Sequence, residues 1–222
     1  MTHEEYLNLG LSCYSFGDYE KAIECFEKAI NLKPYDTEAY FGCAKVYNEM
    51  GNINFKKGNS NESIHCYEKA IKLNPNYAMA YYNVGNVYLN KGNYDKAVMC
   101  YKKAIELEPN EAKVYLAYSN MGVAYLKKGN YENAIWCYEK VIGLKLGNVI
   151  AAMAYQNMGN VNFKKGSYDN AEECFRNAYE LNNDLVDAFY IMRGLMYQKE
   201  GNQEKANECF EKAKLSEYFL RN

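Results

Sequence analysis

Apolar residues recur along the chain with the period of an amphipathic helix. Ala22, Phe26 and Ala29 lie at positions i, i+4 and i+7, which places them on one face of a helix. A small residue beside a large one on that face lets neighbouring helices interlock. The same small–aromatic–small spacing returns at Ser63, Tyr67 and Ala70; at Ala97, Tyr101 and Ala104; at Ala134, Tyr138 and Val141; at Ala171, Phe175 and Ala178; and at Ala206, Phe210 and Ala213.

Glycine and proline divide each of these blocks into two helices, which we call helix A and helix B. In the first block Gly10 stands where helix A must approach helix B closely, and Gly17 ends helix A because glycine adopts a left-handed conformation at little cost. Pro34, Pro75 and Pro109 end helix B in the first three blocks. The pattern therefore predicts tandem helix-turn-helix pairs.

The block recurs six times in phase. The first glycines of the blocks are Gly10, Gly51, Gly85, Gly122, Gly159 and Gly194, at intervals of 41, 34, 37, 37 and 35 residues. This pattern resembles the tetratricopeptide repeat superfamily over essentially the whole chain. The resemblance implies an all-α fold in which antiparallel pairs stack into a right-handed superhelix, a solenoid whose concave face is lined mainly by the A helices.

We expect residues 1–222 to form a single solenoid domain, because one repeat cannot bury its own apolar stripe and depends on stacking. The repeats are predicted at approximately 3–36, 44–77, 78–111, 115–148, 152–185 and 187–220.

Departures from the common repeat length predict local differences. Seven extra residues before Gly51 predict a long helix A from near Thr37 to Lys57. Three extra residues precede Gly122 and Gly159, near Val114 and Val149, and should lengthen helices or loops there. Residues 216–220 are predicted to extend the last helix B.

Charge and hydropathy limit which kinds of partner the chain can bind and in which cellular compartment we expect it. The 26 basic and 28 acidic residues nearly cancel, so no net field attracts nucleic acid or an anionic membrane. The chain has neither an apolar run of about 20 residues nor a secretory signal. We expect a cytoplasmic protein with neither nucleic-acid nor membrane partners.

The cysteines follow the repeat rather than a metal or disulfide pattern. Six of the eight stand just before the helix B aromatic residue: Cys25, Cys66, Cys100, Cys137, Cys174 and Cys209. Equivalent atoms of adjacent repeats should lie roughly 10 Å apart, too far for a disulfide. No C-x-x-C pair exists, and His3 and His65 are the only histidines. We therefore interpret these thiols as reduced, small hydrophobic side chains.

No signature of catalysis or of a cofactor appears in the chain. The glycines are explained by the repeat, and the sequence contains no phosphate-binding loop, nucleophile elbow or zinc motif. We expect a non-enzymatic protein without metal or cofactor.

Asparagines recur two residues before and one residue after the first glycines, three apart and so on one helical face. Lysines often stand five residues after the glycine, on the same face. By the resemblance, this face lines the concave groove. The predicted peptide-binding residues are Asn52, Asn83, Asn86, Asn120, Asn157, Asn160, Lys56, Lys127 and Lys164.

Asparagine suits a peptide groove because its amide both donates and accepts hydrogen bonds. It can pair with the backbone of an extended peptide, and a lysine row favours an acidic partner. The arrangement is similar to the asparagine ladders of the superfamily members in O-linked N-acetylglucosamine transferase and in the polarity scaffolds that bind G-protein regulatory peptides. Two simpler explanations compete: asparagine is common throughout this chain, and lysine near a helix C-terminus complements the helix dipole.

The sequence thus predicts a protein–protein interaction scaffold that binds an extended peptide or protein segment. Alternatives are a structural subunit that forms homo-oligomers through its terminal repeats or through Met99 and Trp136, a non-catalytic part of a larger enzyme, and a co-chaperone. The last would use a carboxylate clamp. Asn52 and Asn83 match that clamp, whereas its basic positions hold Asn48, Leu116 and Asn120.

Overall fold

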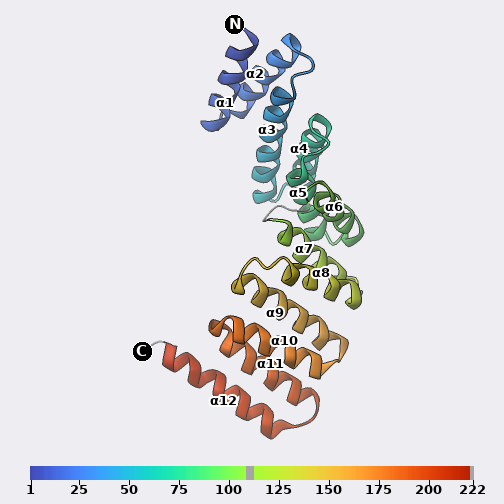
Figure 1. The fold of residues 1–222 in the computed structure, drawn as a ribbon, viewed down its shortest axis with the longest axis vertical. Coiled ribbons are helices and arrows are strands. Elements are labelled where there is room, and N and C mark those ends of the chain that lie inside the picture. Colours follow the sequence, from blue (N-terminus) through green and yellow to red (C-terminus); the bar gives the residue numbers. More distant parts are fainter. Residues whose placement is uncertain (109–112, 221–222) are drawn as a thin grey trace. The chain divides into compact units, whose positions relative to one another are not determined.

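The computed structural model describes residues 1–108 and 113–220, and these ranges contain α-helices, one short 3-10 turn and no strand (Figure 1). The all-α prediction is confirmed. The helices are α1 (His3–Ser15), α2 (Tyr19–Leu32), α3 (Thr37–Lys56), α4 (Ser60–Leu73), α5 (Ala78–Asn90), α6 (Tyr94–Leu107), α7 (Val114–Lys127), α8 (Tyr131–Gly143), α9 (Asn148–Lys165), α10 (Tyr168–Leu181), α11 (Val186–Lys199) and α12 (Gln203–Leu220).

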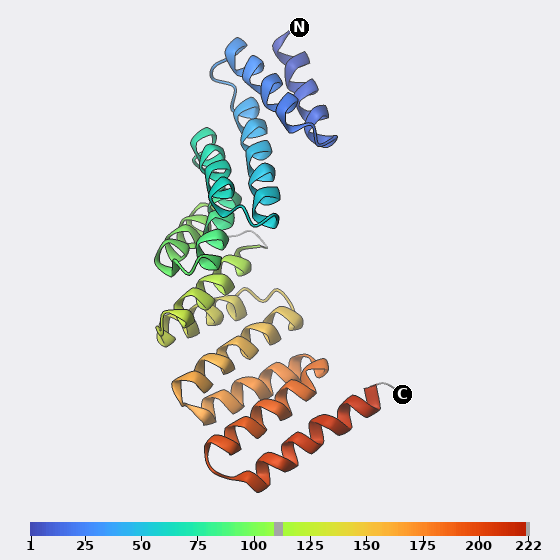
Figure 2. The same ribbon diagram turned by 180° about the vertical axis from the view of Figure 1, so that it is seen from behind.

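Consecutive helices form antiparallel pairs. Within the pairs α1/α2, α3/α4, α5/α6, α9/α10 and α11/α12 the two helices pack along each other (Figures 1 and 2). The chain divides into two compact units, residues 1–117 (unit 1) and 118–222 (unit 2), which are described separately below. The single domain expected over residues 1–222 stays a prediction.

A glycine ends helix A of each pair, as predicted. Gly17 has φ of +79°, and the N–H of Asp18 donates to the carbonyl oxygen of Cys13 at 2.9 Å, which closes the end of α1. The side chain of Asp18 then accepts from the N–H of Lys21 at 3.3 Å and caps α2. The equivalent residues Gly58, Gly92, Gly129, Gly166 and Gly201 have φ between +74° and +83°.

The first glycine of each pair admits an aromatic ring from helix B. A Cβ atom on Gly85 would lie 2.6 Å from Cε1 of Tyr101, a side chain that is 0% exposed. We call this contact the glycine notch. The corresponding contacts are Gly10 with Phe26, Gly51 with Tyr67, Gly122 with Tyr138, Gly159 with Phe175 and Gly194 with Phe210.

Neighbouring pairs bury each other's apolar stripes. In unit 1 the ring of Phe26 also meets the next helix A, where a Cβ atom on Gly42 would lie 2.6 Å from it. Ala22, Phe26 and Ala29 share one core cluster with Cys43 and Val46 of α3. This stacking is the reason that a single repeat does not suffice.

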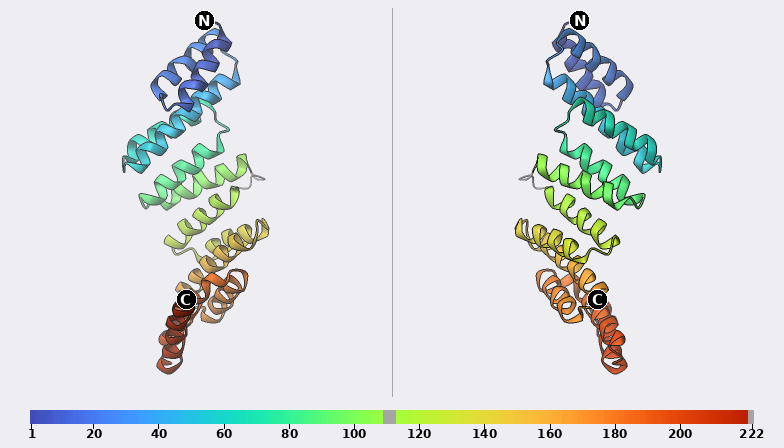
Figure 3. Two further views of the ribbon diagram at one scale, coloured as in Figure 1. Left: turned by 90° about the vertical axis from the view of Figure 1, so that its left-hand side faces the viewer. Right: turned by 90° about the vertical axis from the view of Figure 1, so that its right-hand side faces the viewer.

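The unusual repeat lengths have structural counterparts. The predicted long helix is confirmed, since α3 runs from Thr37 to Lys56, and Gly42 lies in its added part. In unit 2, α9 has 18 residues and begins at Asn148 directly after Gly147. Figure 3 shows the helices of the chain from two further sides. The last helix continues to Leu220, as predicted. Pro109 lies outside the described residues, as does part of the insertion before Gly122.

We predict that Gly85→Ala lowers the free energy of unfolding by about 1–3 kcal/mol, because the added methyl group overpacks the buried ring of Tyr101. Urea denaturation followed by circular dichroism measures the change. Gly143→Ala is the matched control, since a Cβ atom at this last position of α8 meets nothing within 4 Å. Equal stability of the Gly85→Ala variant and the wild type would contradict the notch.

Candidate functional site

The candidate site is the face of helix A formed by the positions six and two before, and one and five after, the first glycine. At 100° per residue these positions span about 60° of the helix surface and point away from the notch. We call it the helix-A face. All nine predicted peptide-binding residues lie on it, on α3, α5, α7 and α9.

In unit 1 the asparagines of this face bond to other residues of the protein. The hydroxyl of Tyr67 donates to Oδ1 of Asn52 at 2.8 Å. Asn83 Nδ2 donates to Oδ1 of Asn48 at 2.9 Å and to Oδ1 of Asn52 at 3.2 Å. Asn48 is only 2% exposed. These bonds connect α3, α4 and α5, so they stabilise the stacking of two repeats.

The same tyrosine contact recurs in the next repeat. The hydroxyl of Tyr101 donates to Oδ1 of Asn86 at 2.8 Å. Burial raises the pKa of Tyr67 to about 12, which keeps its hydroxyl protonated and able to donate. Asn120, at the equivalent position to Asn83 in the fourth repeat, also interacts with neighbouring residues. Sequence reasoning missed these tyrosine partners.

In unit 2 the asparagines of α9 are in a different environment. Asn157 and Asn160 are half-buried, and within the described residues the structure gives their side chains no hydrogen-bond partner. The ring that fills the notch of this repeat belongs to Phe175, which has no hydroxyl to donate. Their amides remain open to a ligand. The sequence signal was Phe175 in place of tyrosine for Asn160, and for Asn157 it was Val123 in the preceding repeat, at the position that Asn52 holds before Asn83.

The predicted lysines lie at or near the ends of their helices. Lys56, Lys127 and Lys164 are exposed, and none has an ion-pair partner among the residues that the structure describes. The neighbouring Lys165 instead pairs with Glu132 of α8 at 2.8 Å. On α3 the face also carries Glu49, whose Oε2 accepts a hydrogen bond from Asn52 Nδ2 at 3.2 Å. In unit 2 the lysines of the face stand beside its amides without a carboxylate at the four positions of α9.

The cysteines are free thiols, seven of them buried and Cys100 half-buried. Burial raises the pKa of Cys43 to about 12 and of Cys100 to about 11. A thiol that stays protonated is a poor nucleophile and metal ligand. Over residues 1–108 and 113–220 no group of three or more His, Cys, Asp or Glu side chains is placed to hold a metal ion. No helix in the same ranges combines the length with the apolar character needed to span a bilayer.

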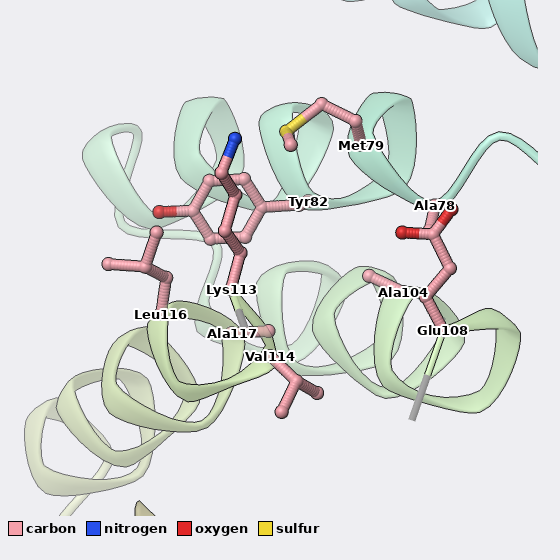
Figure 4. A pocket seen from close by; sticks show the side chains of 9 residues that line it. All are labelled: Ala78, Met79, Tyr82, Ala104, Glu108, Lys113, Val114, Leu116 and Ala117. Carbon is pink, nitrogen blue, oxygen red and sulfur yellow. The ribbon is translucent and has the colours of Figure 1, made fainter. Parts of the chain in front are cut away.

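An apolar cavity of about 50 Å³ lies in unit 1 between α5, the end of α6 and the start of α7 (Figure 4). Met79, Tyr82 and Leu116 line it, and Lys113 and Glu108 stand beside it. The volume is well below the roughly 300–1,000 Å³ of typical small-molecule sites. None of the nine predicted residues lines this cavity.

The second surface considered from the sequence consists of Met99 and Trp136. Both are exposed, at 69% and 44%. Trp136 packs edge-on against Tyr118, with ring centroids 5.9 Å apart, and the Lys140 ammonium lies 5.3 Å from its ring. Met99 belongs to unit 1 and Trp136 to unit 2. A shared surface of the two residues stays a prediction.

Comparison with known proteins identifies the repeat. Family models described as "TPR repeat" match residues 10–51 and 51–92, and models described as "Tetratricopeptide repeat" match residues 78–111, 115–148, 152–185 and 188–215. No curated protein matches the chain.

Solved structures share the fold. A crystal structure of a MamA protein is 27% identical, with a TM-score of 0.59 over 82% of this chain and 93% of that one. A MamA fragment from Desulfovibrio magneticus RS-1 is 22% identical, with a TM-score of 0.57 over 82% and 96%. BtubC (BKLC) from P. vanneervenii is 16% identical, with a TM-score of 0.72 over 100% and 93%.

We predict that Tyr67→Phe lowers the free energy of unfolding by about 1 kcal/mol, because Asn52 loses a hydrogen bond from a buried donor. Phe175→Tyr is the reciprocal variant, which supplies a hydroxyl beside Asn160 and should leave stability unchanged or slightly higher. Urea denaturation of both variants measures the difference. A Tyr67→Phe protein as stable as the wild type would show that the hydroxyl contributes nothing.

Proposed function

Because the chain belongs to the tetratricopeptide repeat superfamily, we propose that it is a non-enzymatic scaffold that binds an extended peptide or protein segment on its helix-A face. The repeats and the similarity to MamA support a protein-interaction scaffold in general. The specific site rests on the side chains of the face, taken unit by unit.

The open amides of Asn157 and Asn160 carry the proposal. Each amide can donate to a backbone carbonyl oxygen and accept from a backbone N–H, whatever side chains the ligand has. Both side chains are already half-buried, so part of their desolvation has occurred before a ligand arrives. Two such groups one helical turn apart suit a segment that offers its backbone groups in a regular row.

In unit 1 the residue proposed to bind the ligand is Asn83, and Asn52 holds its side chain in place. Asn83 uses both amide hydrogens on Asn48 and Asn52, and its Oδ1 has no partner among the described residues. That oxygen is left to accept from a ligand N–H. Asn52 accepts from Tyr67 and Asn83, so in this proposal it positions Asn83. The same bonds engage Asn48, Asn52 and Asn83, which disfavours the carboxylate clamp.

The lysines set the charge of the partner. In unit 1 Lys56 is exposed on a face that also carries Glu49. In unit 2 Lys127 and Lys164 are exposed on the same face as Asn157 and Asn160, with no carboxylate at the face positions, so the segment bound there is acidic. Exposed charges attract mainly through a screened field. Binding should therefore weaken as salt is added.

We predict that Asn157→Ala/Asn160→Ala weakens peptide binding about tenfold or more, because each variant position loses one or two hydrogen bonds to the ligand backbone. The probes are peptides selected from a displayed random library on the wild-type chain. Fluorescence anisotropy gives Kd for each peptide with each variant.

The matched control is Asn133→Ala/Asn170→Ala, which removes two exposed amides from α8 and α10 of the same unit. This control should bind like the wild type. Equal Kd values for the wild type and the α9 variant, with both proteins folded by circular dichroism, would exclude these asparagines as the site.

A further inference from the structure

The helix-A face of α9 changes character along its length. At its N-terminal end Met153 is 56% exposed, and Val149, which lies one turn before the four defined positions, is 60% exposed. The open amides of Asn157 and Asn160 follow, and the exposed Lys164 stands at the C-terminal end. At 100° per residue all five positions fall within about 80° of one another. One face therefore runs from apolar through amide to cationic.

The apolar end is a product of the longer helix. α9 has 18 residues, whereas α1 and α5 have 13. The added turn carries Val149 one turn before Met153, and Leu146, 37% exposed, precedes them. Single exposed apolar residues are ordinary on protein surfaces. Here, however, Val149 and Met153 lie next to the two unpaired amides on the same side of the helix. A binding site with a hydrophobic subsite has this arrangement.

The cationic end extends across unit 2. Lys127 of α7, Lys164 of α9 and Lys199 of α11 each stand five residues after the first glycine, and all are exposed. None of them has a carboxylate partner within the described residues. The pair between Lys165 and Glu132 brings the end of α9 to the start of α8, directly after the end of α7.

The positions of this face in unit 2 contain no acidic side chain. They are Asn120, Val123, Lys127, Met153, Asn157, Asn160, Lys164, Ala188, Met192, Leu195 and Lys199. The face is therefore complementary to a ligand that is anionic at one end and apolar at the other.

We propose that unit 2 binds a partner segment in which a large apolar side chain lies about five residues from one or more acidic side chains. The apolar side chain packs on Val149 and Met153, and the carboxylates pair with the lysine row. Met153 and Lys164 are eleven residues apart on a helix, or about 16 Å at 1.5 Å per residue. An extended segment covers that distance in about five residues. This inference rests on the proposed function and specifies its ligand.

The test is a selection of randomised twelve-residue displayed peptides on the full wild-type chain, followed by Kd measurements with capped synthetic peptides. Enriched peptides should pair an apolar residue with Asp or Glu four to six positions away, in either order. Met153→Glu should weaken these peptides about tenfold or more, and Lys164→Glu should weaken them similarly. The matched control is Leu32→Glu, at an apolar side chain of unit 1 that is 53% exposed at the end of α2, and it should leave Kd unchanged.

The outcomes separate this inference from the function on which it rests. Peptides that lose affinity with Asn157→Ala/Asn160→Ala, yet tolerate Met153→Glu and share no apolar–acidic spacing, would overturn the inference and leave the peptide-binding function standing. Peptides indifferent to all of these variants, or a selection that enriches none, would overturn both.

Discussion

The packing of one aromatic ring against one glycine determines most of this structure. In every pair a helix B ring occupies the space that a Cβ atom on helix A would need, as with Tyr101 at Gly85. This contact fixes how closely the two helices approach and which side of helix A faces its partner. Residues about 130° around helix A from the glycine do not pack against this ring, so the contact does not restrict their identity. Those residues form the helix-A face, where function can vary without loss of the fold.

The notch and the face are nevertheless coupled through a single oxygen atom. When the ring is a tyrosine and the residue after the glycine is an asparagine, the hydroxyl bonds to that asparagine, as Tyr67 does to Asn52. When the ring is Phe175, the asparagine after the glycine, Asn160, keeps its amide free. The identity of the buried helix B ring, tyrosine or phenylalanine, thus determines whether the asparagine after the glycine is hydrogen-bonded within the protein or available to a ligand. The asparagine stripe therefore has two roles, support of the stack at Asn52 and availability to a ligand at Asn157 and Asn160.

The sequence predicts the fold well because its determinants are local. Glycine, aromatic and small residues at fixed spacing define each pair, and the seven extra residues before Gly51 predicted the long α3. The state of the asparagines was not predictable from helical phase alone. It depends on contacts between repeats, such as that of Asn83 with Asn48, 35 residues apart. The exposure of Val149 and Met153, 60% and 56%, was likewise not predictable from helical phase.

Side chains from one sequence pattern thus divide into structural and available amides. Exchange of asparagine side-chain amide protons with water, measured by NMR on asparagine-labelled protein, tests this division directly. We expect slow exchange for Asn83, whose amide makes two hydrogen bonds within the protein. We expect fast exchange for Asn157 and Asn160, whose amides make none within the described residues. Equal exchange rates at these three residues would contradict it.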